Sequence, residues 1–165
     1  MSRMIRLGMW LVILVISGGV QAQFYRLGAN SQYVIQGESV YDKRADLTWA
    51  RCTVGQRWKE RVGCEGIVRV FTFDQAQQQG ANGWRVPSKK ELVTLIDRKK
   101  ANSHRKPTID NVAFPDMDES ILRYWTSTPD GASGGWDVSF LDGTINYLSN
   151  RSDTYPVRLV RNGQI

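Results

Sequence analysis

The chain has 165 residues, of which 41% are hydrophobic and 23% are charged. This length suits one compact domain, and this composition excludes a disordered chain, a collagen-like chain and a multi-span membrane protein. One histidine and two cysteines are too few for a zinc site built from those residues, and a histidine-dependent catalytic triad has only His104 to draw on.

Residues 1–22 have the pattern of a secretory signal peptide. Arg3 and Arg6 precede an apolar run over 7–16, and small residues follow it up to Ala22. The apolar run is too short for a membrane span, which needs about 20 residues; an uncleaved anchor is the alternative. We therefore expect an exported protein, periplasmic or extracellular, with no membrane span after cleavage and a single mature domain over 23–165.

Signal cleavage would also change the distribution of charge. The full chain has 22 Lys and Arg against 16 Asp and Glu, a net charge of +6, and loss of Arg3 and Arg6 leaves 20 against 16. Five of the remaining cations fall in one stretch around His104, at Arg98, Lys99, Lys100, Arg105 and Lys106. The basic character is therefore local, on a body that is otherwise nearly neutral.

Export would place Cys52 and Cys64 in an oxidising compartment, where two cysteines of a small domain usually pair. Such a bond would stabilise the fold by about 3 kcal/mol through the loop that it closes. Two unpaired thiols are the alternative. A redox site is a weaker one, because the spacing is far from Cys-x-x-Cys.

Extended segments are expected first along the mature chain. Residues 39–42 and 47–52 are predicted as two short strands joined by a turn, and β-branched and aromatic residues over 67–72 favour another extended segment.

Two capping boxes then predict two short helices. Thr72 with Gln75 and Ser88 with Glu91 each place a hydroxyl residue three positions before a Glu or Gln. The second helix is expected to end near Asp97, where the basic stretch begins.

The remainder reads as a polar loop over 101–115, a helical turn over 117–123 and three strands over 124–128, 136–141 and 157–161. Asp142-Gly143 predicts a two-residue hairpin turn that pairs Phe140 with Ile145 and Val138 with Tyr147. Asp137 and Ser139 would then lie on the opposite face from the apolar residues.

These expected strands and helices predict one α+β domain. Several of its sequence strings resemble those of the Lcl C-terminal domain family, in the same order, over residues 40–161. They are Asp46-Leu47-Thr48-Trp49 with Arg51-Cys52, Gly83-Trp84-Arg85-Val86-Pro87-Ser88 with Glu91-Leu92, Phe114-Pro115, Tyr124-Trp125-Thr126-Ser127-Thr128, the 136–143 hairpin and Val157-Arg158-Leu159-Val160-Arg161.

This resemblance implies a C-type-lectin-like fold, with two short helices packed on a twisted antiparallel sheet and the chain ends near each other. The domain that names the family is an adhesion module associated with sulfated glycosaminoglycans, whereas most members have no assigned activity. The collagen-like stalk of that protein has no counterpart here, so its trimeric state is not carried over.

The tryptophans are expected mainly in the core. Trp49, Trp84, Trp125 and Trp136 are predicted to be buried, with Arg85 paired to a carboxylate before the second helix; a sugar-stacking role is the alternative. Trp58 is the tryptophan expected to be most exposed.

No metal, cofactor or catalytic site is predicted. The acidic cluster Asp110, Asp116, Asp118 and Glu119 could hold calcium, but its spacing is that of neither an EF-hand nor a sugar-binding calcium motif. Solvated loop acids and a helix N-terminus are the preferred interpretations. Ser127 with His104 lacks a nucleophile-elbow string, so an enzyme is not expected.

The stretch that holds Arg98, Lys99, Lys100, His104, Arg105 and Lys106 is the candidate ligand-binding site, interpreted as a projecting basic loop. Clustered cations attract polyanions. We therefore expect a non-enzymatic binding or adhesion module for an anionic polysaccharide or another envelope polyanion. The spacing fits no nucleic-acid-binding motif.

Two alternatives stay open. The protein could be a protein-interaction subunit of an envelope or pilus assembly, or a periplasmic inhibitor of a secreted toxin, and in either case binding would be mostly non-electrostatic. The basic stretch could also be a solvated segment that only aids solubility.

Overall fold

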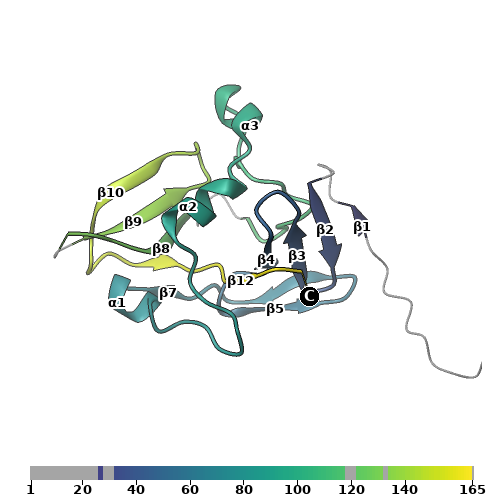
Figure 1. The fold of residues 1–165 in the computed structure, drawn as a ribbon, viewed down its shortest axis with the longest axis horizontal. Helices are drawn as coiled ribbons and strands as arrows, with labels where there is room; N and C mark the ends of the chain where they lie inside the picture. Colours follow the sequence, from purple (N-terminus) through teal and green to yellow (C-terminus); the bar gives the residue numbers. More distant parts are fainter. Residues whose placement is uncertain (1–25, 28–31, 118–121, 132–133, 165) are drawn as a thin grey trace, which may run out of the picture.

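A computed structural model describes residues 26–27, 32–117, 122–131 and 134–164 (Figure 1). The predicted signal peptide over 1–22 lies outside these residues. The domain is α+β, with mostly antiparallel strands, a few short helices and one disulfide.

The largest sheet has five antiparallel strands in the order β1-β2-β3-β4-β12. They are β1 (Arg26–Leu27), β2 (Tyr33–Gln36), β3 (Ser39–Asp42), β4 (Leu47–Ala50) and β12 (Val160–Asn162). The predicted strand over 39–42 is confirmed. The one predicted over 157–161 is shorter than expected, because Val157 and Leu159 accept single bonds from Val54 and Ala50 in place of a continuous ladder.

The second sheet has three antiparallel strands in the order β10-β9-β8. They are β8 (Arg123–Asp130), β9 (Gly134–Ser139) and β10 (Ile145–Asn150). The predicted hairpin register is wrong, because Ile145 pairs with Val138 and not with Phe140.

Contacts outside the hairpin explain this register. The Phe140 carbonyl accepts bonds from the Thr108 N–H at 2.7 Å and hydroxyl at 3.0 Å, while its own N–H donates to Leu122. The chain therefore leaves β9 before Phe140. Within β9, Asp137 is fully buried and forms an ion pair with Arg123.

The described residues also form two antiparallel ladders of two strands each. β7 (Val70–Phe71) pairs with β11 (Tyr155–Pro156), and β5 (Gln56–Lys59) pairs with β6 (Gly63–Gly66). The predicted Cys52–Cys64 bond is confirmed, and it joins β6 to the end of β4.

Both predicted capping boxes are present. Thr72 caps α1 (Phe73–Ala76) and Ser88 caps α2 (Lys89–Leu92), which continues as the 3-10 turn η1 (Val93–Leu95). A third helix, α3 (Arg98–Asn102), was not expected. The side chain of Asp97 caps it by accepting bonds from the N–H groups of Lys99 and Lys100, so the first part of the basic stretch is helical and not a loop.

Two apolar clusters form the core. Trp49 lies in the larger and Trp125 in the smaller, both fully buried as predicted. Trp84 and Trp136 are only half-buried, against expectation. Each ring is covered by a cation, Arg161 over Trp84 and Lys89 over Trp136, and this contact replaces burial in the core.

Arg85 pairs with a carboxylate before the second helix, as predicted. Its guanidinium makes two bonds to Glu91, at 2.8 and 2.6 Å, and Glu91 also accepts from the N–H and hydroxyl of Ser88. The bonds from Arg85 are the main reason that the pKa of Glu91 falls to about 2. One carboxylate therefore joins the 85–88 turn to the first turn of α2.

We expect this pair to make stability depend on pH. Because the pKa of Glu91 is lowered by folding, its contribution is present above the pKa of the unfolded carboxyl and is lost as the pH falls toward about 2. Urea unfolding of the wild type and Glu91→Gln should therefore differ most at pH 7, and the difference should shrink between about pH 5 and pH 2.

The exposed Glu38 provides the control substitution. Glu38→Gln should differ from the wild type by less than about 0.5 kcal/mol at every pH. A Glu91→Gln difference that stays constant down to pH 2 would contradict the role given to the Arg85–Glu91 pair.

Candidate functional site

Residues 98–106, which we call the basic arm, protrude from the body of the domain. Figure 1 places α3 at the top of the molecule, away from β5 at the opposite end. Five of the six predicted site residues on the arm are exposed, namely Arg98, Lys99, His104, Arg105 and Lys106, whereas Lys100 is half-buried.

Backbone bonds hold both ends of the basic arm at one point. The N–H of Asp97 donates to the carbonyl of Thr108 at 2.8 Å, and the N–H of Thr108 donates to the carbonyl of Phe140 at 2.7 Å. Gly143 leaves room for the arm, since a Cβ atom on it would lie 3.2 Å from the Cβ of Ala101. The arm is thereby fixed to the β9–β10 hairpin.

Lys100 differs from the other cations of the arm. Its Nζ donates to the carbonyl of Ile109 at 2.6 Å and to the Asn111 side chain at 2.7 Å. Two of its donors are thus used to tie α3 to the segment that follows the arm. The structure assigns Lys100 to holding the arm, not to contacting a ligand.

The other four cations have no ion pair with any described carboxylate. Arg105 is exposed and donates from Nε to the hydroxyl of Ser103 at 3.1 Å. His104, at φ 55°, reverses the chain after α3. The chain therefore presents Arg98, Lys99, Arg105 and Lys106 on a short, anchored segment.

A groove of about 800 Å³ runs beside α3 and adds a cation that sequence reasoning missed. Arg98 and Lys99 line one part of it and Arg44, in the turn between β3 and β4, another. Nothing in the local sequence connects Arg44 with the arm, because only the pairing of β2, β3 and β4 brings that turn to the groove.

Two carboxylates also line this groove, and both are engaged in local structure. Asp97 caps α3, and Asp110 accepts bonds from the N–H groups of Val112 and Ala113. Burial, followed by the charge of Asp42, raises the pKa of Tyr33 at the groove floor above its ordinary value. The hydroxyl of Tyr33 therefore stays protonated and neutral.

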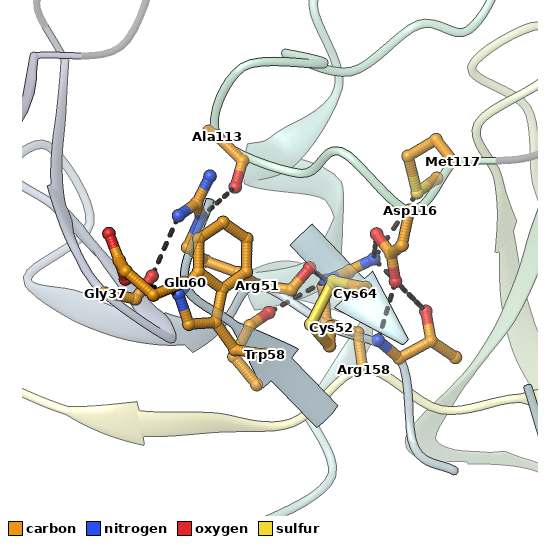
Figure 2. Close-up of a disulfide and its surroundings, with 12 residues drawn as sticks. Gly37, Arg51, Cys52, Trp58, Glu60, Cys64, Ala113, Asp116, Met117 and Arg158 are labelled. Carbon is orange, nitrogen blue, oxygen red and sulfur yellow. Dashed lines mark hydrogen bonds and ion pairs between the residues drawn. A yellow bond between two sulfur atoms is a disulfide. The ribbon is translucent and has the colours of Figure 1, made fainter. Parts of the chain in front are cut away.

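Asp116, one of the acidic residues considered for calcium, is engaged inside the protein (Figure 2). The side chain of Asp116 is fully buried, where it pairs with Arg158 at 2.6 Å and accepts bonds from the N–H and hydroxyl of Thr53. Asp118 and Glu119 lie outside the described residues. Within the described part of the chain, no three acidic, histidine or cysteine side chains gather as a metal site would require.

The chain matches the model of a known family, the Lcl C-terminal domain, over residues 38–161. The strings noted in the sequence lie within this match, in β4, the 85–91 turn, β8, β9 and β12. The chain belongs to the Lcl C-terminal domain family. A search of curated proteins returns no match. Among the described residues, no helix has the length and apolarity needed to cross a membrane.

Substitutions should separate the cation that holds the arm from those that it presents. Lys100→Ser removes two bonds from a charged, half-buried donor and should lower the free energy of unfolding by about 1 kcal/mol. Arg98→Ser should change it by less than about 0.5 kcal/mol. Urea unfolding measures both, and equal losses in the two variants would contradict the division of roles.

Proposed function

We propose that this member of the Lcl C-terminal domain family is an exported, non-enzymatic binding module that recognises an anionic glycan, sulfated or phosphorylated, through the basic arm. The single observation that carries the proposal is the set of four exposed cations on an anchored segment, none of them in an ion pair with a carboxylate that the structure describes. Lys100 supports the site by fixing the arm, and His104 by turning the chain between the two pairs of cations.

The chemistry of these cations suits sulfate and phosphate esters. A guanidinium can donate two parallel bonds to such a group, and a lysine supplies a point charge. Because both ends of the arm are held by Thr108, little conformational entropy is lost when a ligand orders it. Arg44, which lines the same groove as Arg98 and Lys99, extends the positive surface, so an extended polyanion fits better than a single small anion.

The remaining features support a binding role over a catalytic one. Cys52 and Cys64 are joined in a disulfide and provide no nucleophile. His104, the one histidine of the chain, is exposed on the arm. The disulfide also favours an oxidising compartment and hence export. As a finer description of the α+β domain, we propose that it is C-type-lectin-like, with loops free to diversify around a shared core.

A protein-interaction role is the second candidate, and one observation favours it. The segment that follows the disulfide hairpin exposes Ile67 to 84% and Val70 to 50%, and the hairpin itself exposes Val62 to 60%. Exposed apolar side chains in one region suit a protein partner, such as another subunit of an envelope or pilus assembly or a secreted toxin. Such binding would persist in high salt.

Heparin chromatography tests the leading proposal. The purified wild type should be retained, and the variant with Arg98, Lys99, Arg105 and Lys106 all changed to Ser should elute at much lower salt, because most of its counterion-releasing contacts are gone. Replacement of Arg57, Lys59, Arg61 and Arg69 by Ser removes four cations elsewhere and should change the elution far less. Equal elution of the two variants would contradict the proposal.

The groove provides a separate prediction. Arg44→Ser should also lower the salt concentration at which the protein leaves heparin, since Arg44 lines the groove beside α3. The control is Lys43→Ser, which removes the same charge from the neighbouring residue. Lys43 does not line the groove, so this variant should have the smaller effect. If Lys43→Ser weakens retention as much as Arg44→Ser does, the groove adds nothing beyond net charge.

A further inference from the structure

A second groove, of about 530 Å³, lies at the disulfide end of the domain, and we call it the aromatic groove. Trp58 and Trp84 line it, together with Glu38, Gln56, Arg57 and Leu159. Trp58 is on β5, which Figure 1 places at the end of the molecule opposite α3. The aromatic groove is therefore separate from the basic arm.

Each tryptophan ring has an arginine against one face. The guanidinium carbon of Arg51 lies 3.7 Å from the centroid of Trp58, and that of Arg161 lies 4.6 Å from the centroid of Trp84. Figure 2 shows Arg51 against the ring of Trp58, beside the disulfide. Trp58 and Trp84 are both half-buried, and both line the groove. The rings are thus partly covered from within the protein and partly open to a ligand.

Trp58 is also held in place before any ligand arrives. Arg51 donates to the carbonyls of Gly37, Val112 and Ala113, so the cation under the ring is fixed by two backbone segments. The indole N–H of Trp58 donates to Glu60 at 3.1 Å. A rigid aromatic surface binds with little loss of entropy.

One side chain that lines the groove has a buried polar atom without a partner. The Oε1 atom of Gln56 is buried and accepts no hydrogen bond from any described group. A buried acceptor left unpaired is unfavourable, and such atoms in native proteins are commonly satisfied by a water or a ligand. A hydrogen-bond donor that reached Oε1 of Gln56 from the groove would remove this penalty.

We propose that the aromatic groove binds a pyranose ring of an uncharged oligosaccharide. The C–H face of a sugar carries partial positive charge and suits the negative face of an indole ring. A sugar hydroxyl both donates and accepts, so it can pair with Gln56 and Glu38 as acceptors and with Arg57 as donor. The opposite charges of Glu38 and Arg57 give the groove no preference for an anion.

This ligand differs from that of the basic arm, and the inference does not rest on the proposed function. An apolar peptide side chain or a lipid chain would leave Gln56 unpaired, and a polyanion would face the carboxylate of Glu38. A neutral sugar uses both the aromatic surface and the polar rim. Binding should consequently be insensitive to salt, whereas binding to the arm should weaken as salt is added.

Titration of the full-length protein with cellohexaose, chitohexaose and mannohexaose tests the proposal, with tryptophan fluorescence as the signal. At least one of these neutral sugars should change the emission and bind with the same affinity in about 50 mM and about 500 mM salt. Trp58→Ala and Trp84→Ala should each weaken that binding about tenfold, since stacking on one aromatic ring contributes on the order of 1 kcal/mol or more.

Trp136→Phe is the matched control, because Trp136 is half-buried and covered by a cation but does not line the groove. It should leave the affinity unchanged. Gln56→Leu should weaken sugar binding several-fold while the melting temperature stays constant or rises, since an unpaired buried acceptor has been removed. If Gln56 had only a structural role, Gln56→Leu would lower the melting temperature and leave the sugar affinity unchanged.

Trp58→Phe keeps a ring in place if Trp58→Ala fails to fold, and it should retain most of the affinity. Three results would overturn the proposal: none of the three sugars binds, added salt abolishes the binding, or the Trp58 and Trp84 variants bind as the wild type does. The heparin result is independent of each of them.

Discussion

The buried ion pair between Arg158 and Asp116 is the interaction on which the rest of the structure depends. Both side chains are fully buried, with 2.6 Å between Nη2 and Oδ1 (Figure 2). Arg158 also donates to the carbonyls of Ala50 and Arg51, so one guanidinium joins the end of β4, the approach to β12 and the loop that holds Asp116. A buried charge that lost its partner would cost several kcal/mol, which ties these three segments to one arrangement.

That arrangement positions both candidate binding surfaces. On one side of the pair, Arg51 spans from Gly37 to Ala113 and supports Trp58, while the Cys52–Cys64 bond holds the hairpin that carries this ring. On the other side, the chain beyond α2 returns through Thr108 to the carbonyl of Phe140, and the basic arm lies between these points. Each binding surface is a short exposed segment whose ends are fixed by buried contacts.

Local features could be predicted because neighbouring residues determine them. The capping boxes at Thr72 and Ser88, the pair between Arg85 and Glu91 and the strand over 39–42 each need only residues close in sequence. The hairpin register could not be predicted in the same way. Asp142-Gly143 indicated a tight turn, but the distant residues Thr108 and Leu122 take the backbone groups of Phe140 and move the pairing.

By itself, the sequence determined the family, the α+β class, the disulfide partners and the location of the excess positive charge, because these depend on residue types and their order. Only the tertiary structure decided that Lys100 holds the arm, that Arg44 lines a groove together with two cations of the arm, and that Trp58 and Trp84 line another groove. These are contacts between segments far apart in the chain. They depend on how the sheets pack and not on any local pattern.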